Sequence, residues 1–479
     1  MPSPSPSPSQ TPTVIGEGTY GCVHKPSLKC RNKPKIKDNN IVSKLMTDEN
    51  ATDELNEFEL IKKSDKKENF HLGKPKSCKV DNNITNQIAI DECRDFGRFE
   101  IDNYSLLLLK YGGTDLLKFS NYIKELSPNT ENTRMIEHFW LEVSRILFGI
   151  KTLYDNGNIH HDLKHLNIVY NKDKKRINLI DFGLMTTKSK IIRDAKNSNY
   201  SFGINHWSFP IEMKLYNKNT FGEVIKYNSK KLKNYITDNL YDITEYHSHL
   251  FECILENSDK QNSKYKKTVN MFFYNYYQMI SNLLPNQYDL FIEKSIETID
   301  TYGTATGLLY VLKNCKKHIS TELYKDLKSF LLNMVSFNVF IRDSPQVVVN
   351  KYENILLKHD LLKKYNMTFV DHILTPGSQP TLINTPITFK QQPNFVDSII
   401  IQCPVGKEVN TKTNRCINEC KDGFERNDKF LCRKRKIQKH KSHKKCPTGT
   451  ELNPNTNRCN KTCKTGYKRN SEFKCVKEK

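Results

Sequence analysis

The chain has 479 residues and a formal net charge of +22, with 75 Lys and Arg against 53 Asp and Glu. At roughly 100–200 residues per domain, this length predicts more than one domain. Apolar runs such as residues 106–109 fall far short of the ~18 residues that a membrane helix needs, so we expect no membrane span. The N-terminus lacks the basic start and apolar core of a secretory signal, so we expect a cytoplasmic protein.

The positive charge is concentrated near the C-terminus. Residues 403–479 hold 22 Lys and Arg against 8 Asp and Glu, a net charge of +14, which leaves +8 for the 402 residues before them. Such a segment favours acidic proteins, nucleic acid or anionic membranes as partners, and charge alone does not decide among them.

Residues 1–13 begin with alternating Pro and Ser, which predicts a disordered polyproline-type segment. A glycine-rich stretch follows, and glycine lets the backbone approach phosphate groups closely. Because the stretch leads into a β-like segment and then a strand lysine, it favours a phosphate-covering hairpin over the turn of a dinucleotide-binding fold. An ordinary glycine-rich hairpin is the alternative. The candidate nucleotide-binding residues are Ile15, Gly16, Glu17, Gly18, Thr19, Tyr20, Gly21, Cys22, Val23 and Lys44.

Lys44 needs a carboxylate partner if it is to contact phosphate groups. Residues 48–63 are rich in acids and carry apolar side chains at helical spacing, which predicts a short amphipathic helix. Glu57 lies about one turn before an apolar pair, and we predict that it points inward to Lys44. Glu54 and Glu59 are its rivals, and all three glutamates could instead be surface charges.

The next segments predict a connection between two lobes. Residues 104–109 form a predicted buried strand, and residues 110–116 connect this strand to the second lobe. Asp115 in this connection could bind a ribose hydroxyl group or cap a helix. Apolar side chains recur every three or four positions between residues 136 and 153, which predicts a long helix facing the core.

The densest group of chemically active side chains is His160-His161-Asp162-Leu163-Lys164-His165-Leu166-Asn167, followed by Asp181-Phe182-Gly183. Asp162 could accept the proton of an attacking hydroxyl group, and Lys164 could neutralise charge on a phosphoryl group. Asn167 and Asp181 offer the hard oxygen ligands that Mg²⁺ prefers. Their order and spacing predict phosphate transfer from a metal-bound nucleotide to an alcohol.

Together these motifs resemble those of the eukaryotic-type protein kinases, over residues 14–365. The resemblance implies an α+β bilobal fold, with a small β-rich lobe, a large helical lobe and ATP with Mg²⁺ between them. It implies that Asp162 is the catalytic base, that Lys164 assists it, and that Lys44, held by Glu57, orients the phosphates. Asn167 and Asp181 would hold magnesium, and Ile15 and Val23 would flank the adenine. Lys164 matches the serine/threonine pattern, so the expected acceptors are Ser and Thr side chains of proteins.

The resemblance also assigns structural roles. Pro210-Ile211-Glu212 is similar to the end of an activation segment, and Arg342 falls where the family has an arginine paired with that glutamate. Asp300 is similar to the buried aspartate that anchors the catalytic loop. His160 would pack that loop against Asp181-Phe182-Gly183.

Three departures from the family pattern are informative. His161 replaces an arginine that pairs with a phosphorylated activation segment in many kinases, so we expect activation without such phosphorylation. An insertion at about 213–299 is either a docking element or extra helical packing. Ile211 stands where the family has proline, which leaves the anchoring of Glu212 open.

A linker at 366–402 precedes two repeats, residues 403–432 and 446–479, which share one cysteine spacing and flank a basic linker at 433–445. Their four cysteines each could close disulfides or bind zinc. The repeats resemble two-cysteine adaptor modules that accompany kinases in large nucleocytoplasmic DNA viruses. This resemblance implies an iridovirus-like kinase whose tail recruits a partner, in the host cytoplasm, the virion or the nucleus.

The sequence therefore predicts an ATP- and Mg²⁺-dependent serine/threonine protein kinase. One alternative is a pseudokinase-type scaffold, although the lysine, the base and the metal ligands of the family are all present. The other is a nucleic-acid-binding protein that acts through its basic Cys-rich tail.

Overall fold

The structure is a computed structural model, and the part of the chain that it describes comprises residues 11–18, 21–33, 40–94, 100–200, 208–238, 248–255, 263–365, 407–410, 415–418, 420, 424–427, 431–434, 446–453, 458–470 and 473–477. Contacts divide the chain into two units, residues 1–399 and 400–479. Of the segment predicted to be disordered, residues 1–10 lie outside the described part, and so does the whole predicted linker at 366–402.

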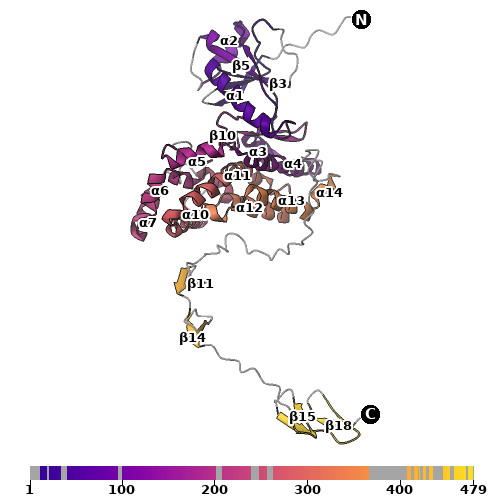
Figure 1. The fold of residues 1–479 in the computed structure, drawn as a ribbon. Helices are drawn as coiled ribbons and strands as arrows, with labels where there is room; N and C mark the ends of the chain where they lie inside the picture. The colour runs from indigo at the N-terminus through magenta and orange to yellow at the C-terminus, as the bar shows by residue number, and fades with distance from the viewer. Residues whose placement is uncertain are drawn as a thin grey trace, which may run out of the picture. The chain divides into compact units, whose positions relative to one another are not determined.

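The first unit begins with a five-stranded antiparallel sheet in the order β1-β2-β3-β5-β4 (Figure 1). Its strands are β1 (Thr13–Gly18), β2 (Gly21–Lys25), β3 (Ile41–Thr47), β4 (Lys76–Lys79) and β5 (Tyr104–Lys110). Lys44 of the central strand β3 is paired with Val23 on one side and Leu107 on the other. This register places Lys44 next to the glycine-rich hairpin.

Two helices accompany the sheet, α1 (Asp48–Ser64) and α2 (Ile84–Asp91). The hydroxyl group of Thr47 accepts a hydrogen bond from the Asn50 amide and so caps α1. Phe58 and Ile61 lie on the buried face of α1 and belong to the main apolar core. The predicted helix at 48–63 is therefore confirmed, with an end one residue later.

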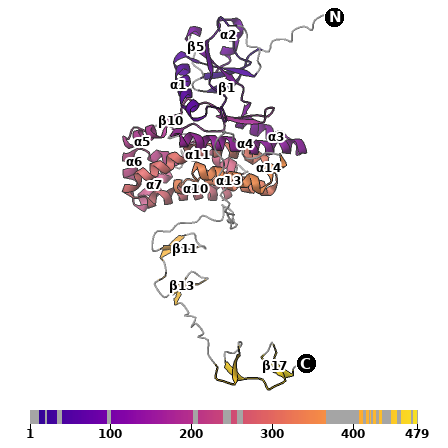
Figure 2. The same cartoon turned by 45° about the vertical axis from the view of Figure 1, so that its right-hand side comes forward.

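Two disulfides, Cys22–Cys93 and Cys30–Cys78, cross-link this β-rich region. All four cysteines belong to or pack against a small apolar cluster that also contains Ala89 of α2. Figures 1 and 2 both show α2 at the end of the sheet that is remote from the helical part. None of the sequence patterns described above predicts these bonds.

The rest of the described first unit is mainly helical (Figure 2). Its α-helices are α3 (Leu116–Glu125), α4 (Thr130–Asp155), α5 (Lys188–Lys196), α6 (Lys218–Val224), α7 (Ser229–Asp238), α9 (Ser248–Leu255), α10 (Ser263–Asn282), α11 (Tyr288–Cys315), α12 (Thr321–Met334), α13 (Pro345–Lys358) and α14 (Leu361–Lys364). Short 3₁₀ helices are η1 (Ile101–Asn103), η2 (Ile211–Leu215), η3 (Pro285–Gln287) and η4 (Val339–Ile341).

Helix α11 is the central element of this helical part. It contacts α3, α4, α5, α9 and α12, and most of its residues are buried. A helix that is apolar around most of its circumference belongs in a core. The predicted long helix is α4, whose apolar stripe is buried as expected.

Short strands flank α3 and α4 in the chain, one just before α3 and the others between α4 and α5. Strands β6 (Thr114–Asp115), β8 (Ile168–Asn171) and β9 (Arg176–Leu179) form one sheet, and β7 (Asn158–Ile159) pairs with β10 (Thr186–Thr187). Asp115 caps α3, since its side chain accepts a hydrogen bond from the Lys118 amide at 2.8 Å. These strands bracket residues 160–167 and Asp181.

The insertion at 213–299 is largely helical where it is described. Phe272 and Phe273 of α10 are buried in the main apolar core and lie 4.9 and 5.8 Å, between ring centroids, from Phe337. These aromatic side chains therefore support the packing alternative and not an exposed docking element.

Where it is described, the second unit forms short antiparallel hairpins. Its strands are β11 (Lys407–Asn410), β12 (Arg415–Asn418), β13 (Phe424–Arg426), β14 (Cys432–Lys434), β15 (Thr450–Asn453), β16 (Arg458–Lys461), β17 (Tyr467–Arg469) and β18 (Cys475–Lys477). Described disulfides join Cys420–Cys432, Cys446–Cys459 and Cys463–Cys475. These six cysteines therefore form three disulfide pairs, as the disulfide alternative predicts. Zinc binding would instead need free thiolates.

The predicted α+β class is confirmed, with a β-rich N-terminal region and a helical part after it. Every helix in the described part of the chain is too short or too polar to cross a lipid bilayer.

Candidate active site

The loop at 160–167 is anchored to α11 by hydrogen bonds. The Asp300 carboxylate accepts hydrogen bonds from the amides of His160 and His161, at 2.7 and 2.9 Å. Gly303, one turn later, allows this approach: a Cβ atom there would lie 2.1 Å from the carbonyl oxygen of Leu163. The predicted anchoring role of Asp300 is confirmed.

Three side chains of this loop converge. The Lys164 ammonium donates to both carboxylate oxygen atoms of Asp162 at 2.9 Å. Nδ2 of Asn167 donates to the Asp162 carbonyl oxygen at 2.7 Å and to Oδ2 at 2.8 Å. Since these bonds use the nitrogen of the Asn167 amide, its Oδ1 atom is the one with which it would bind a cation. The loop thus presents a carboxylate with a fixed orientation.

Lys44 of β3 joins a second polar group. Its ammonium donates to Glu54 of α1 at 2.6 Å and to Asp181 at 3.2 Å. Burial disfavours the charged lysine, but the two carboxylates outweigh burial and raise the pKa of Lys44. The ammonium of Lys44 in turn holds the pKa of Asp181 below its usual value.

The choice of Glu57 as partner of Lys44 was wrong in this structure, because the partner is Glu54. The buried face of α1 carries Ala51, Glu54, Phe58 and Ile61, at spacings of three and four residues. Glu54 lies on that stripe, whereas Glu57 lies to one side of it. Counting turns back from Phe58 would have selected Glu54.

Glu57 nevertheless approaches the Asp181-Phe182-Gly183 segment. A Cβ atom on Gly183 would lie 3.7 Å from Oε2 of Glu57, and that oxygen is buried without a hydrogen-bond partner in the described part of the chain. Burial, followed by the charge of Glu54, raises the pKa of Glu57 to about 8. A carboxyl group in this state is largely protonated at neutral pH.

Aromatic rings connect α1 to the 160–167 loop. Phe182 is buried, and its ring lies 5.5 Å from Phe58 and 4.8 Å from His160. Nε2 of His160 is also 3.1 Å from the carbonyl oxygen of Ile180. The expectation that His160 packs the loop against this segment is confirmed.

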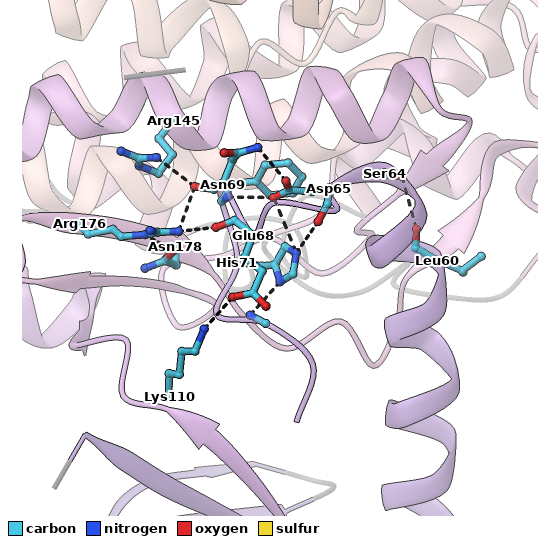
Figure 3. Close-up of polar contacts among 12 residues, drawn as sticks. Leu60, Ser64, Asp65, Glu68, Asn69, His71, Lys110, Arg145, Arg176 and Asn178 are labelled. Atoms are coloured by element: carbon cyan, nitrogen blue, oxygen red, sulfur yellow. Dashed lines mark hydrogen bonds and ion pairs between the residues drawn. The ribbon is translucent and has the colours of Figure 1, made fainter. Parts of the chain in front are cut away.

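The loop after α1 is fixed by polar contacts from the helical part (Figure 3). Arg145 of α4 donates to the carbonyl oxygen of Asn69 at 3.1 Å, and Arg176 of β9 donates to the carbonyl oxygens of Glu68 and Asn69. Because Nδ1 of His71 accepts from the Gly73 amide, its Nε2 carries the proton and donates to the Asp65 carbonyl oxygen. These contacts set the position of α1, and with it Glu54.

The predicted nucleotide-binding residues lie mainly in the β1–β2 hairpin. Ile15, Gly16, Glu17 and Gly18 are in β1, and Gly21, Cys22 and Val23 are in β2, while Thr19 and Tyr20 lie outside the described residues. A Cβ atom on Gly21 would lie 2.7 Å from the Leu45 carbonyl oxygen, so this position requires glycine. Among the described residues, nothing within 4 Å would meet a Cβ atom on Gly18, and this space suits a ligand close to the backbone.

The site has a donor set that suits a nucleotide with Mg²⁺. The Ile180 amide donates to the Asn167 carbonyl oxygen at 3.0 Å, which holds Asn167 beside Asp181. Their carboxamide and carboxylate oxygens are the hard ligands that Mg²⁺ accepts. Lys44 adds a cation suited to phosphate.

A different group of potential metal ligands, Cys22, His24 and Cys93, lies in the β-rich region. The two sulfur atoms are bonded to each other, and Nε2 of His24 is 2.9 Å from the Ala89 carbonyl oxygen, to which it must donate. In this arrangement the disulfide and the Ala89 hydrogen bond already use the two sulfurs and Nε2.

The segment after Asp181 ends at a buried ion pair. The Arg342 guanidinium contacts Oε1 of Glu212, and Ser295 donates to the same oxygen at 2.8 Å. Both charged side chains are fully buried. The predicted pairing of Glu212 with Arg342 is confirmed, and Ile211 is itself buried and does not prevent it.

Comparison of the sequence with protein-family models finds no match, and a search of curated proteins finds none either.

Proposed function

We propose that this protein is a serine/threonine protein kinase that transfers the γ-phosphoryl group of ATP to hydroxyl groups of protein side chains. The observation that carries the proposal is the junction between two polar groups. One comprises Asp162, Lys164 and Asn167, and the other comprises Lys44, Glu54 and Asp181. They are joined through the Ile180–Asn167 backbone hydrogen bond. The same arrangement supports a bilobal kinase fold, with the ATP between sheet and helices.

In the proposed reaction the acceptor oxygen forms a bond to the γ-phosphorus while the bond from that phosphorus to the β–γ bridging oxygen breaks. Asp162 orients the acceptor hydroxyl group and receives its proton, and ADP leaves with the bridging oxygen. Lys164, hydrogen-bonded to Asp162, offsets negative charge beside the transferred group. Lys44 orients the phosphates of the donor.

Magnesium, when bound, would neutralise charge on the phosphate oxygen atoms. Asn167 and Asp181 would hold it, because both carry hard oxygen ligands and the backbone of Ile180, next to Asp181, is hydrogen-bonded to that of Asn167. The low pKa of Asp181 keeps its carboxylate ionised for this role.

The test compares purified wild-type protein with Lys44→Met and Asp162→Asn variants, using Mg²⁺ and γ-labelled ATP with generic basic Ser/Thr substrates. We expect a general base to be worth roughly 10²–10⁴-fold, so Asp162→Asn should lose at least that order of turnover while ATP still binds. Asp155→Asn, an exposed change on α4, is the control and should retain wild-type turnover. Equal phosphate incorporation by all four proteins would refute the proposal.

A pseudokinase scaffold would bind nucleotide without labelling a substrate, and the same assay separates it from an enzyme. For residues 403–479 we propose an adaptor role that recruits a protein partner. Exposed side chains of the last hairpin, Tyr467 and Val476, lie in strands that also carry Lys468, Arg469 and Lys477, which suits an acidic partner with some apolar surface.

A further inference from the structure

His161, immediately before the proposed base, makes a buried contact with the segment after Asp181. Its Nε2 atom lies 2.8 Å from the hydroxyl oxygen of Tyr200. The two residues are 4 % and 7 % exposed, and the edge of one ring faces the other at 6.1 Å between centroids. The ring of Phe209 lies 5.7 Å from His161 and closes another side of this site.

This contact joins two neutral groups. Burial, helped by the nearby charges of His160 and Lys190, lowers the pKa of His161 to about 4. Burial also raises the pKa of the Tyr200 hydroxyl. A neutral imidazole cannot attract a phosphate as an arginine would, but it can form a hydrogen bond with a phenol hydroxyl group.

The backbone of His161 is fixed as well. Its φ angle is +69°, a left-handed conformation that costs free energy for a residue other than glycine. The hydrogen bond from its amide to Asp300 compensates for this cost. Because Asp162 is the next residue, any displacement of His161 is passed directly to the carboxylate.

Tyr200 is anchored on its other side to the end of the same segment. Its ring packs against Tyr216, 4.9 Å between centroids. The Tyr216 hydroxyl donates to Ser295 at 2.8 Å, and Ser295 donates to Glu212, the partner of Arg342. Continuous contacts thus run from the catalytic loop through Tyr200 to the buried ion pair.

We propose that Tyr200 is a positioning residue, whose hydrogen bond to His161 holds residues 181–200 against the catalytic loop without phosphorylation of that segment. This inference rests on the proposed kinase function and names a regulatory property of the same site. Tyr200 touches neither substrate nor phosphate in the proposal and acts through His161. The competing interpretation is that Tyr200 only fills space in the core.

Tyr200→Phe separates these interpretations, because it retains the ring and removes one hydroxyl group. Loss of the hydrogen bond between Tyr200 and the buried imidazole of His161 should reduce kcat about 5- to 10-fold. It should also raise KM for the protein acceptor and leave KM for ATP unchanged. Tyr227→Phe is the matched control, since it removes a hydroxyl group that bonds Glu223 at the surface. The control should keep wild-type values of all three constants.

A double-mutant cycle tests the pairing itself. His161→Phe combined with Tyr200→Phe should lose no more kcat than the worse single variant, because both act on one contact. Additive losses would show that the two residues act separately and would overturn the proposal. Phosphatase treatment of the wild-type protein should leave kcat unchanged, and a loss of activity would overturn it too.

Hydrogen–deuterium exchange gives a readout that does not depend on activity. Tyr200→Phe should exchange faster in residues 188–200 and in the 160–167 loop, but not in α12. Unchanged exchange there would overturn the positioning role. A wild-type protein that is as inactive as Asp162→Asn would instead refute the kinase function, so the two failures are distinguishable.

Discussion

At the scale of single residues, the position of a glutamate on α1 decides whether it pairs with Lys44. Glu54 and Glu57 are three residues apart on α1, and only Glu54 reaches the ammonium. Glu57 instead has a buried oxygen atom near Gly183 without a cationic partner among the described contacts. The two glutamates should therefore respond differently to the same substitution.

Glu54→Gln removes the charge nearest to Lys44, whose side chain is 13 % exposed. We expect the free energy of unfolding to fall by about 3 kcal/mol, because a largely buried ammonium loses one of its two partners. We also expect kcat/KM for ATP to fall at least about tenfold. Glu57→Gln is the matched control, and its kcat/KM for ATP should stay within about twofold of the wild-type value. Urea unfolding and steady-state kinetics measure both; equal losses would contradict the assignment.

Glu57 predicts a pH dependence of stability. Its pKa is about 8 in the folded protein against an ordinary value of 4.5. Between these values the folded protein keeps a proton that the unfolded chain releases, so Glu57 lowers stability as pH rises from 4.5 to 8. Glu57→Gln lacks this dependence. From pH 5 to pH 8 the variant should gain about 1 kcal/mol over wild type, after allowance for the exposed part of the side chain.

Urea unfolding of both proteins at pH 5, 6.5 and 8 measures this difference. A constant difference across the three pH values would show that Glu57 keeps an ordinary pKa in the folded protein.

At the scale of elements, the two disulfides of the β-rich region supplement a small core. The loops that they close span 71 and 48 residues, and both loops contain Lys44 and α1. Cross-links over such loops restrict the unfolded chain. Cys22–Cys93 also ties β2, which comes after the glycine-rich turn, to the segment just after α2, whereas Cys30–Cys78 ties the segment after β2 to β4.

Replacing Cys22 and Cys93 together by Ser should lower the free energy of unfolding by about 2–4 kcal/mol. Adding a dithiol reductant to denaturing buffer should lower wild-type stability similarly, but affect the variant less. Mass spectrometry of peptides alkylated without reduction checks the bond directly. Free thiols at both positions in folded protein would contradict it, whereas Cys253 and Cys315 should remain unpaired.

At the scale of the whole molecule, all described contacts of the candidate site lie within residues 1–399, and the basic repeats form the other unit. We therefore expect a chain ending at residue 402 to retain kcat within about twofold of wild type, since no catalytic group is removed. The full chain should show any nucleic-acid binding that the +14 tail provides, with an affinity that falls steeply with salt.

Filter binding at low and at high salt measures that affinity for both chains. Equal, salt-dependent binding by the shortened chain would place the nucleic-acid surface in the first unit.

The sequence predicted some features of this protein and left others open. The helix at α4 could be predicted because its apolar side chains are periodic, while the α+β class and the anchoring of the loop by Asp300 were implied by the family resemblance of the motifs. The insertion was left open, since aromatic side chains look alike whether they face a core or a partner. The burial of Phe272 and Phe273 supports packing for this part of the insertion.

By itself, the sequence determined which chemical groups stand close together along the chain: Asp162, Lys164 and Asn167 share one loop because covalent spacing leaves them little choice. The tertiary structure decided the pairings across the chain. Lys44 with Glu54, His161 with Tyr200 and Cys22 with Cys93 are separated by 10, 39 and 71 residues. Helical periodicity favours Glu54 over Glu57 as the inward-facing glutamate of α1. The pairings themselves depend on the angle at which a helix faces the sheet and on how distant segments pack, which local patterns do not encode.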